Sequence, residues 1–252
     1  VVLAVSMIGN GDSAGTNGCY AADPLFEYGF YLADGSPCTN AGTITAAEAG
    51  LDGRTTRTDG TPDADAIDLG YHYATGKDPA YADLYVIPGN SDTNSGTNWT
   101  EAVGTIRAAM GKAWLGSHIH IGSGTYTTNS GESFPILLDI SGVHLLGDGM
   151  GDVILRAPGN PVQTRVVVLQ DASFCHLEGM TIAGGYFNGG GVSFYGSGVY
   201  IDNAYEAEIA SCMVTSNHIF GGNNTFAWGA GIVAYDSTVE MRDCVIQTNR
   251  IY

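Results

Sequence analysis

Four aspartates crowd one Gly- and Pro-containing stretch of the sequence, at Asp59, Asp63, Asp65 and Asp68. Calcium binds about six to eight oxygen ligands, many of them carboxylates on flexible loops. The spacing does not follow the helix-loop-helix calcium pattern, and no Glu closes the stretch. A calcium site is therefore one interpretation. The alternative is an acidic turn whose aspartates accept hydrogen bonds from nearby backbone amides.

Two histidines, His118 and His120, lie two positions apart in an alternation of polar and apolar residues. In a strand, side chains at alternate positions share one face, so both imidazoles point the same way. A zinc site needs a third and usually a fourth ligand, and none is close in sequence. Histidines on the outward face of a sheet are the simpler interpretation.

A constant 32-residue step connects four other polar positions. If the step reflects stacking, their side chains lie one above another, about 4.8 Å apart. A Glu beside a His could serve as an acid/base pair; the alternative is a solvated polar ladder, in which a basic group such as Arg242 offsets repulsion between glutamates. The four positions are His144, His176, Glu208 and Glu240.

The chain has five cysteines. Cys19 and Cys38 lie in an irregular segment with few apolar residues, where a disulfide would stabilise a small core; we predict this pairing for an oxidising compartment. Cys212 and Cys244 are separated by the same constant step and are expected to face inward as small apolar side chains. A nucleophilic role for them would require a nearby base, and the sequence shows none.

The 32-residue step extends to the neighbours of the polar positions, and it is the strongest indication of fold. A fixed period in the range of roughly 20 to 50 residues is typical of a solenoid, whose units bury their apolar faces only by stacking. Short strands separated by Gly turns indicate an all-β right-handed parallel β-helix. The predicted interior ladders are Leu145, Leu177, Ile209 and Met241; Cys212 and Cys244; and Asn217 and Asn249.

The composition agrees with an all-β solenoid, because 37 of 252 residues are Gly and only 14% are charged. The net charge of −17 argues against nucleic acid as a partner, since its phosphates are neutralised by Lys and Arg. An acidic surface suits an extracellular or cell-surface protein that collects divalent cations such as calcium. No run approaches the length of about 18 apolar residues expected for a membrane span.

Three regions follow from the pattern. Residues 1–80 are expected to form the last coil and irregular tail of an upstream β-helix. Residues 81–116 should contain a strand and a capping helix over 97–114, where Asn98 and Glu101 form a capping-box-like pair. Residues 117–252 are predicted to be β-helix coils, incomplete at the C-terminal end.

Several stretches resemble secreted right-handed parallel β-helix proteins. Residues 84–110 resemble the strand-loop-helix opening of such domains, and residues 121–126 resemble their first turn. Residues 23–26, 35–38 and 63–73 look like the tail that follows their last coil. The resemblance implies that the tail of one β-helix is followed by the start of the next, and hence that such domains stack in tandem or head to tail. It does not imply one activity, because this fold serves lyases, hydrolases, adhesins and fibres alike.

Two functions remain open at this point. The first is a structural or adhesive segment of a cell-surface protein or extracellular filament, with copies of itself or adjacent repeats stacked end to end as partners. The second is a polysaccharide-active enzyme, a lyase or a glycoside hydrolase. Hydrolases of this fold need paired carboxylates. Asp202, Asp236 and Asp243 could supply them, but no Asp column repeats at the 32-residue step, which favours the first function.

Overall fold

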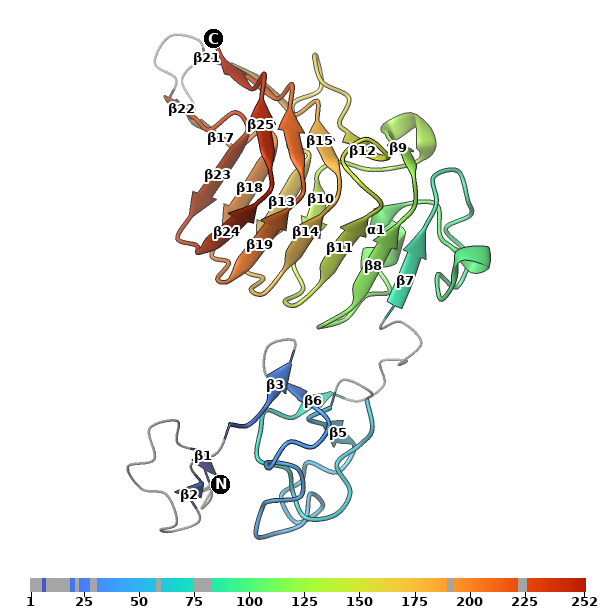
Figure 1. Cartoon of the computed structure of the whole chain (residues 1–252), viewed down its shortest axis with the longest axis vertical. Helices are drawn as coiled ribbons and strands as arrows, with labels where there is room; N and C mark the ends of the chain where they lie inside the picture. The colour runs from blue at the N-terminus through green and yellow to red at the C-terminus, as the bar shows by residue number, and fades with distance from the viewer. Residues whose placement is uncertain are drawn as a thin grey trace. The chain divides into compact units, whose positions relative to one another are not determined.

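The computed structural model describes residues 6–7, 19–20, 23–27, 31–57, 60–74, 83–189, 193–221 and 226–252. The chain divides into two compact units, Val1–Ala82 and Asp83–Tyr252. The second unit is a right-handed parallel β-helix, so the fold predicted from the 32-residue step is confirmed. In Figure 1 its colour passes from green to red as one coil follows another along the sheets.

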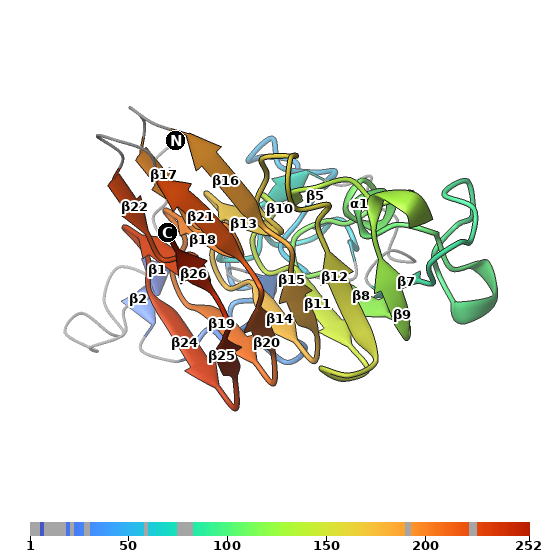
Figure 2. The same cartoon turned by 90° about the horizontal axis from the view of Figure 1, so that it is seen from above.

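Three parallel sheets run along the β-helix, and their strands lie side by side when seen from above (Figure 2). The first sheet has the order β24 (Val239–Arg242), β19 (Ala207–Ala210), β14 (His176–Glu178), β11 (His144–Gly147), β8 (His118–Ile121) and β7 (Asp83–Val86). The second has the order β25 (Val245–Gln247), β20 (Met213–Thr215), β15 (Thr181–Ala183), β12 (Val153–Arg156) and β9 (Gly124–Tyr126). The third consists of β10 (Ile136–Leu138), β13 (Val167–Gln170), β18 (Val199–Asp202) and β23 (Ile232–Tyr235).

The later coils add two smaller parallel sheets. One consists of β16 (Tyr186–Gly189), β21 (His218–Gly221) and β26 (Arg250–Ile251). The other pairs β17 (Ser193–Tyr195) with β22 (Phe226–Trp228). Short strands linked by tight turns keep each coil narrow, and the parallel pairing buries strands against the coils on both sides.

Interior side chains form continuous rows from coil to coil. In the first sheet Leu145 is the register partner of Leu177, Leu177 of Ile209, and Ile209 of Met241. The first three are 0% exposed, whereas Met241 in the last coil is 39% exposed. Burial therefore depends on a coil lying on each side, as expected for a solenoid.

Polar interior groups bond to the backbone of the preceding coil. Cys212 Sγ donates to the carbonyl of Leu177 at 3.6 Å, and Cys244 Sγ to that of Ile209 at 3.3 Å. Asn217, which is fully buried, bonds to residues of both adjacent coils. Thiols and amides thus satisfy carbonyls and amides that apolar side chains would leave without partners.

The entry to the β-helix differs from the single helix predicted over 97–114. A 3₁₀-helix covers Trp99–Glu101, and the α-helix α1 covers Ile106–Met110. Asn98 caps the 3₁₀-helix and accepts from the amides of Thr100 and Glu101, whereas the N-cap of α1 is Thr105. Among the described residues no helix is long and apolar enough to cross a membrane.

The helix is interrupted because the chain pairs with β7. The amide of Val103 donates to the carbonyl of Tyr85, and the amide of Ile87 donates to the carbonyl of Val103. At Gly104 the chain approaches Asn90 so closely that a β-carbon would lie 2.1 Å from the Asn90 oxygen. Tertiary pairing thus overrides the helical periodicity of the sequence.

The short helix packs against strands of the first coils. Its buried residues are Ile106, Ala109 and Met110, and it contacts β7, β8 and β10. Trp114, which follows it, is 3% exposed. The segment therefore shields both the interior and part of the strand edge at this end of the solenoid.

The described residues of the first unit contain little regular structure. Its strands are β1 (Ser6–Met7), β2 (Cys19–Tyr20), β3 (Phe26–Glu27), β4 (Tyr31–Leu32), β5 (Arg54–Thr55) and β6 (Tyr73–Ala74). β3 and β4, and β5 and β6, form antiparallel pairs. Most of residues 1–30 lie outside the described residues, so the predicted last coil of an upstream β-helix stays a prediction.

Cys38 does not form the predicted disulfide with Cys19. It is a free cysteine, fully buried in an apolar cluster with Leu32 and Leu69. Burial raises the pKa of its thiol, so the side chain behaves as a small apolar group. The side chain of Cys19 lies outside the described residues.

Candidate functional site

A continuous row of titratable side chains runs along the outer face of the first sheet. Each member is the register partner of the next, one from each strand of the sheet. We call it the charged row: Asp83, His118, His144, His176, Glu208 and Glu240.

Strand alternation places the charged row outward. Leu84, Ile119 and Leu145, each next to a member of the row, are 0% exposed and face the interior. Because successive side chains of a strand point to opposite faces, the neighbouring polar residues must face outward. Parallel pairing then sets the rungs about 4.8 Å apart.

At one end of the charged row, two histidines lie close to a carboxylate. His120 Nε2 lies 2.8 Å from Asp83 Oδ1, and His118 Nδ1 lies 3.7 Å from the same oxygen. The ring of Tyr85 stacks on that of His120 with centroids 4.9 Å apart. His118 and His120 therefore share one face, as predicted from their spacing, and Asp83 fixes their positions.

The middle of the row consists of stacked imidazoles. The ring centroids of His118 and His144 are 4.9 Å apart, and those of His144 and His176 are 5.5 Å apart. Burial lowers the pKa of His144 to about 4, with a smaller contribution in the same direction from the two flanking histidines. Burial also lowers the pKa of His118 and His176, where Asp83 and Glu178 respectively act in the opposite direction. Burial thus favours the neutral form of all three rings.

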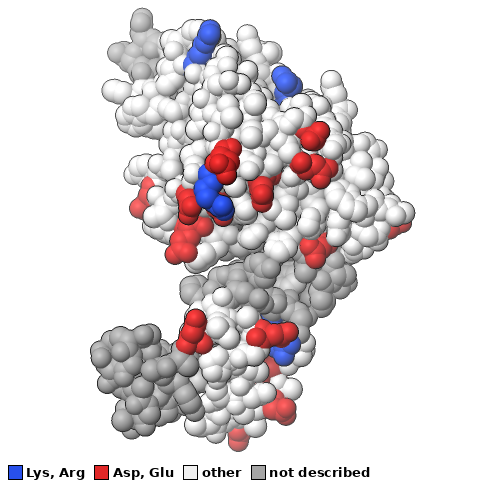
Figure 3. Space-filling view, in the orientation of Figure 1, with Lys and Arg blue, Asp and Glu red and all other residues white. Residues whose placement is uncertain are grey.

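The other end of the row is acidic. Arg242 forms an ion pair with Glu208 and places Nε 3.6 Å from Glu240 Oε1, which offsets the repulsion between the two glutamates. His176 Nε2 lies 3.7 Å from Glu178 Oε2 and 3.9 Å from Glu208 Oε2. Acidic side chains gather over β24, β19 and β14 in Figure 3, with a basic group among them.

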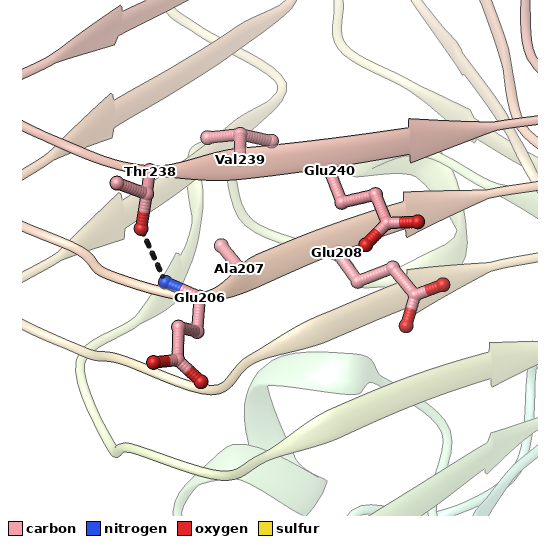
Figure 4. A pocket seen from close by; sticks show the side chains of 6 residues that line it. All are labelled: Glu206, Ala207, Glu208, Thr238, Val239 and Glu240. Carbon is pink, nitrogen blue, oxygen red and sulfur yellow. Dashed lines mark hydrogen bonds between the residues drawn. The ribbon is translucent and has the colours of Figure 1, made fainter.

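A hollow of about 430 Å³ adjoins this acidic end (Figure 4). The amide of Glu206 donates to Thr238 Oγ1 at 2.7 Å, and this bond links the residues just before β19 and β24 at the rim of the hollow. The carboxylates that line the hollow can accept hydrogen bonds and exchange protons with a bound molecule. Within the described part of the chain, no three His, Cys, Asp or Glu residues are arranged to hold a metal ion. The lining residues are Glu206, Ala207, Glu208, Thr238, Val239 and Glu240.

Residues 87–252 match the model of the family described as "Protein of unknown function (DUF1565)". The chain belongs to this family. The DUF1565 match includes every coil of the β-helix after β7 and the entry segment with α1. The first unit lies outside it.

Other comparisons with this DUF1565 chain are more distant. No curated protein matches its sequence. A solved structure of a pectin methylesterase mutant in complex with a hexasaccharide is similar at 11% sequence identity and a TM-score of 0.39. The similarity covers 65% of this chain and 48% of that one, so the DUF1565 chain spans about half its length.

Two of the four aspartates, Asp63 and Asp68, accept hydrogen bonds from backbone amides, but both are buried rather than part of a solvated turn. Asp63 Oδ2 accepts from the amide of Asp68 and lies 2.8 Å from His72 Nε2. Asp68 accepts from the amide of Asn40 at 2.6 Å and from the hydroxyl of Thr56. Both carboxylates are buried and occupied by these bonds.

The other two aspartates differ in what the structure describes. Asp65 is exposed, and Asp59 lies outside the described residues. Calcium binding by these four aspartates stays a prediction.

The 32-residue step does not reveal that Asp83 and His118 extend the row. The step from Asp83 to His118 is longer than the main step and the step from His118 to His144 is shorter, so a search at a fixed period passes over them. A signal was present in the local pattern, because in both 83–86 and 118–121 a polar or aromatic residue alternates with an aliphatic one. Matching strands by alternation rather than by a fixed step would have found both residues.

We expect acid to destabilise the DUF1565 β-helix through His144. An unfolded His titrates near pH 6.5, whereas the pKa of His144 in the folded chain is about 4. Between these values the unfolded chain binds a proton that the folded chain does not, so stability is complete above about pH 6.5 and falls toward pH 4. Discounted for the partial exposure of the ring, the loss is about 2 kcal/mol.

Urea unfolding at pH 7 and pH 4.5 measures this loss. The His144→Gln variant removes the titrating group, so it should lose about 2 kcal/mol less than the wild type between the two pH values. An identical pH dependence in the two proteins would show that His144 does not contribute.

Proposed function

We propose that this chain is a structural or adhesive segment of an extracellular β-helix, in a cell-surface protein or filament whose coils stack end to end. The observation that supports it is that burial of the inward rows depends on a neighbouring coil. Met241, Ile246 and Ile251 occupy inward rows, yet they are 39%, 53% and 48% exposed. Their row partners Ile209, Val214 and Ile219 are 0% exposed.

The strand edges of this last described coil can also pair with a further coil. β24, β25 and β26 are each the outermost strand of their sheets among the described residues. An outermost strand presents a line of N–H and C=O groups that can pair with another strand. A further coil with the same step, from an adjacent repeat or a second copy, would match both the edges and the apolar rows.

The assembly can be tested by placing a charge in an inward row. Ile246→Asp puts a carboxylate where a stacked coil would bury it, which costs several kcal/mol without a partner. We expect concentrated wild-type protein to sediment as oligomers and the Ile246→Asp protein to remain monomeric. Both should show the same circular dichroism, since Ile246 is half exposed in the monomer.

The matched control is Gln247→Asp. Gln247 is the next residue on the same strand and faces outward, so its variant should oligomerise like the wild type. A wild-type protein that stays monodisperse and monomeric at high concentration would contradict the stacking proposal.

A polysaccharide-active enzyme is the second candidate. The observation in its favour is His176, an imidazole of lowered pKa within 4.0 Å of two carboxylates. A neutral imidazole beside a carboxylate can act as a general base. Release of reducing ends from a polysaccharide by the wild type, but not by His176→Gln, would favour this candidate over a structural role.

A further inference from the structure

A second hollow, of about 370 Å³, opens on the outer face of the third sheet where it adjoins β17 and β22. This volume is within the range of about 300–1,000 Å³ that is usual for ligand sites. Most of its lining residues are aromatic. We call it the aromatic hollow: Tyr195, Tyr200, Trp228, Val233, Ala234 and Tyr235.

Coil stacking brings these aromatic rings together. Tyr195 is the register partner of Trp228, and their ring centroids are 5.1 Å apart at an interplanar angle of 43°. Trp228 and Tyr235 are 58% and 67% exposed. Phe226, which is 66% exposed, continues the patch with its centroid 6.4 Å from that of Trp228. Exposed aromatic side chains in such a group indicate a binding surface.

Arg165 contacts two residues of the hollow. The Arg165 guanidinium carbon lies 4.3 Å from the centroid of Tyr200 and 5.2 Å from that of Phe187. Arg165 Nε donates to the carbonyl of Tyr195 at 3.0 Å. These contacts hold Tyr195 and Tyr200 in place and engage the guanidinium, so the rings are positioned before any ligand binds.

Polar groups lie beside the rings. The Tyr200 hydroxyl donates to Asp202 Oδ2 at 3.3 Å, and Asp202 is the register partner of Tyr235. A carboxylate here accepts hydrogen bonds from hydroxyl groups and repels anions. The hollow thus combines flat apolar ring faces with hydroxyls and an acceptor.

From this geometry we propose that the aromatic hollow binds a neutral sugar ring of a polysaccharide. The C–H face of a sugar packs on aromatic rings, and its hydroxyls match the Tyr hydroxyls and Asp202. An acidic sugar is disfavoured, because the chain carries a net charge of −17 and Arg165 is already engaged. The inference gives a ligand class to the adhesive part of the proposed function and does not require end-to-end stacking.

Affinity electrophoresis of the full chain tests the inference, with xyloglucan or glucomannan in the gel as neutral probes and polygalacturonate as the acidic probe. We expect at least one neutral probe to retard the wild type and polygalacturonate to have less effect. Trp228→Ala should weaken the retardation at least tenfold. Because Trp228 is mostly exposed, the variant should keep the circular dichroism of the wild type.

The matched control is Trp99→Ala, which removes another exposed Trp, one that contacts Tyr85 near the first coil. It should bind the neutral probe like the wild type. Three results would overturn the inference: no retardation by either neutral probe, equal retardation of the Trp228→Ala protein, or stronger retardation by polygalacturonate. A wild-type chain that is monomeric but still retarded by a neutral probe would contradict end-to-end stacking and would support sugar binding.

Discussion

Replacing Asn217 by Ala is expected to lower the free energy of unfolding by about 2 to 4 kcal/mol. Asn217 is 0% exposed, and its Oδ1 accepts from the amide of Gly185 at 2.9 Å. Its Nδ2 donates to the carbonyl of Ile182 at 3.1 Å and to Asn249 Oδ1 at 2.9 Å. The Ala variant leaves these groups without this partner inside the solenoid, and a buried unsatisfied group costs about 1–3 kcal/mol.

Two comparisons separate hydrogen bonding from side-chain volume. Asn217→Asp keeps the shape but replaces the donating amide with an oxygen that faces the Ile182 carbonyl, so it should destabilise at least as much as Ala. Asn249→Ala should cost less, because Asn249 is only partly buried in the last coil.

Urea unfolding gives the stabilities, and amide hydrogen exchange gives a local measurement at Gly185. Its amide should exchange much faster in the Asn217→Ala protein than in the wild type. Unchanged protection of Gly185 together with unchanged stability would contradict the role assigned to this ladder.

The architecture was predictable because stacking leaves a periodic trace in the sequence. Leu145, Leu177, Ile209 and Met241 share one environment, and the constant step between them is the direct consequence of equal coils. The period fails where a coil differs in length. His118 is the register partner of His144 but precedes it by less than the main step, so the first coils and the full charged row could not be found from the step alone.

The entry helix was predicted too long for a tertiary reason. Val103 has the right spacing for an amphipathic helix, but its backbone pairs with β7. Sequence periodicity does not report such pairing, since it depends on a strand that lies well before Val103 in the sequence and begins at Asp83. Asn98 does act as a cap, but of the 3₁₀-helix, and the cap of α1 is Thr105, which the expected single helix would have placed inside it.

The aromatic hollow escaped prediction because its residues come from different coils. The separation of Tyr195 and Trp228 in the sequence exceeds the main step by one position, and Arg165 comes from the coil before. Each aromatic residue alone is consistent with an ordinary surface side chain. Their grouping appears only once the register of the coils is known.

The second large loss of stability is expected for a substitution in the interior row of the first sheet. Leu177→Ala removes a fully buried side chain between Leu145 and Ile209, and such a change costs about 2–5 kcal/mol. Met241→Ala acts on the same row, but Met241 is 39% exposed because no described coil covers it. It should cost less than about 1 kcal/mol in the monomer.

The difference in free energy of unfolding between these two variants tests most directly whether like side chains stack from coil to coil. Urea unfolding at a protein concentration low enough to keep the chain monomeric measures it. We expect the Leu177→Ala protein to be less stable than the Met241→Ala protein by at least about 2 kcal/mol. Equal losses at the two positions would contradict the stacked interior on which the fold, the charged row and the aromatic hollow all depend.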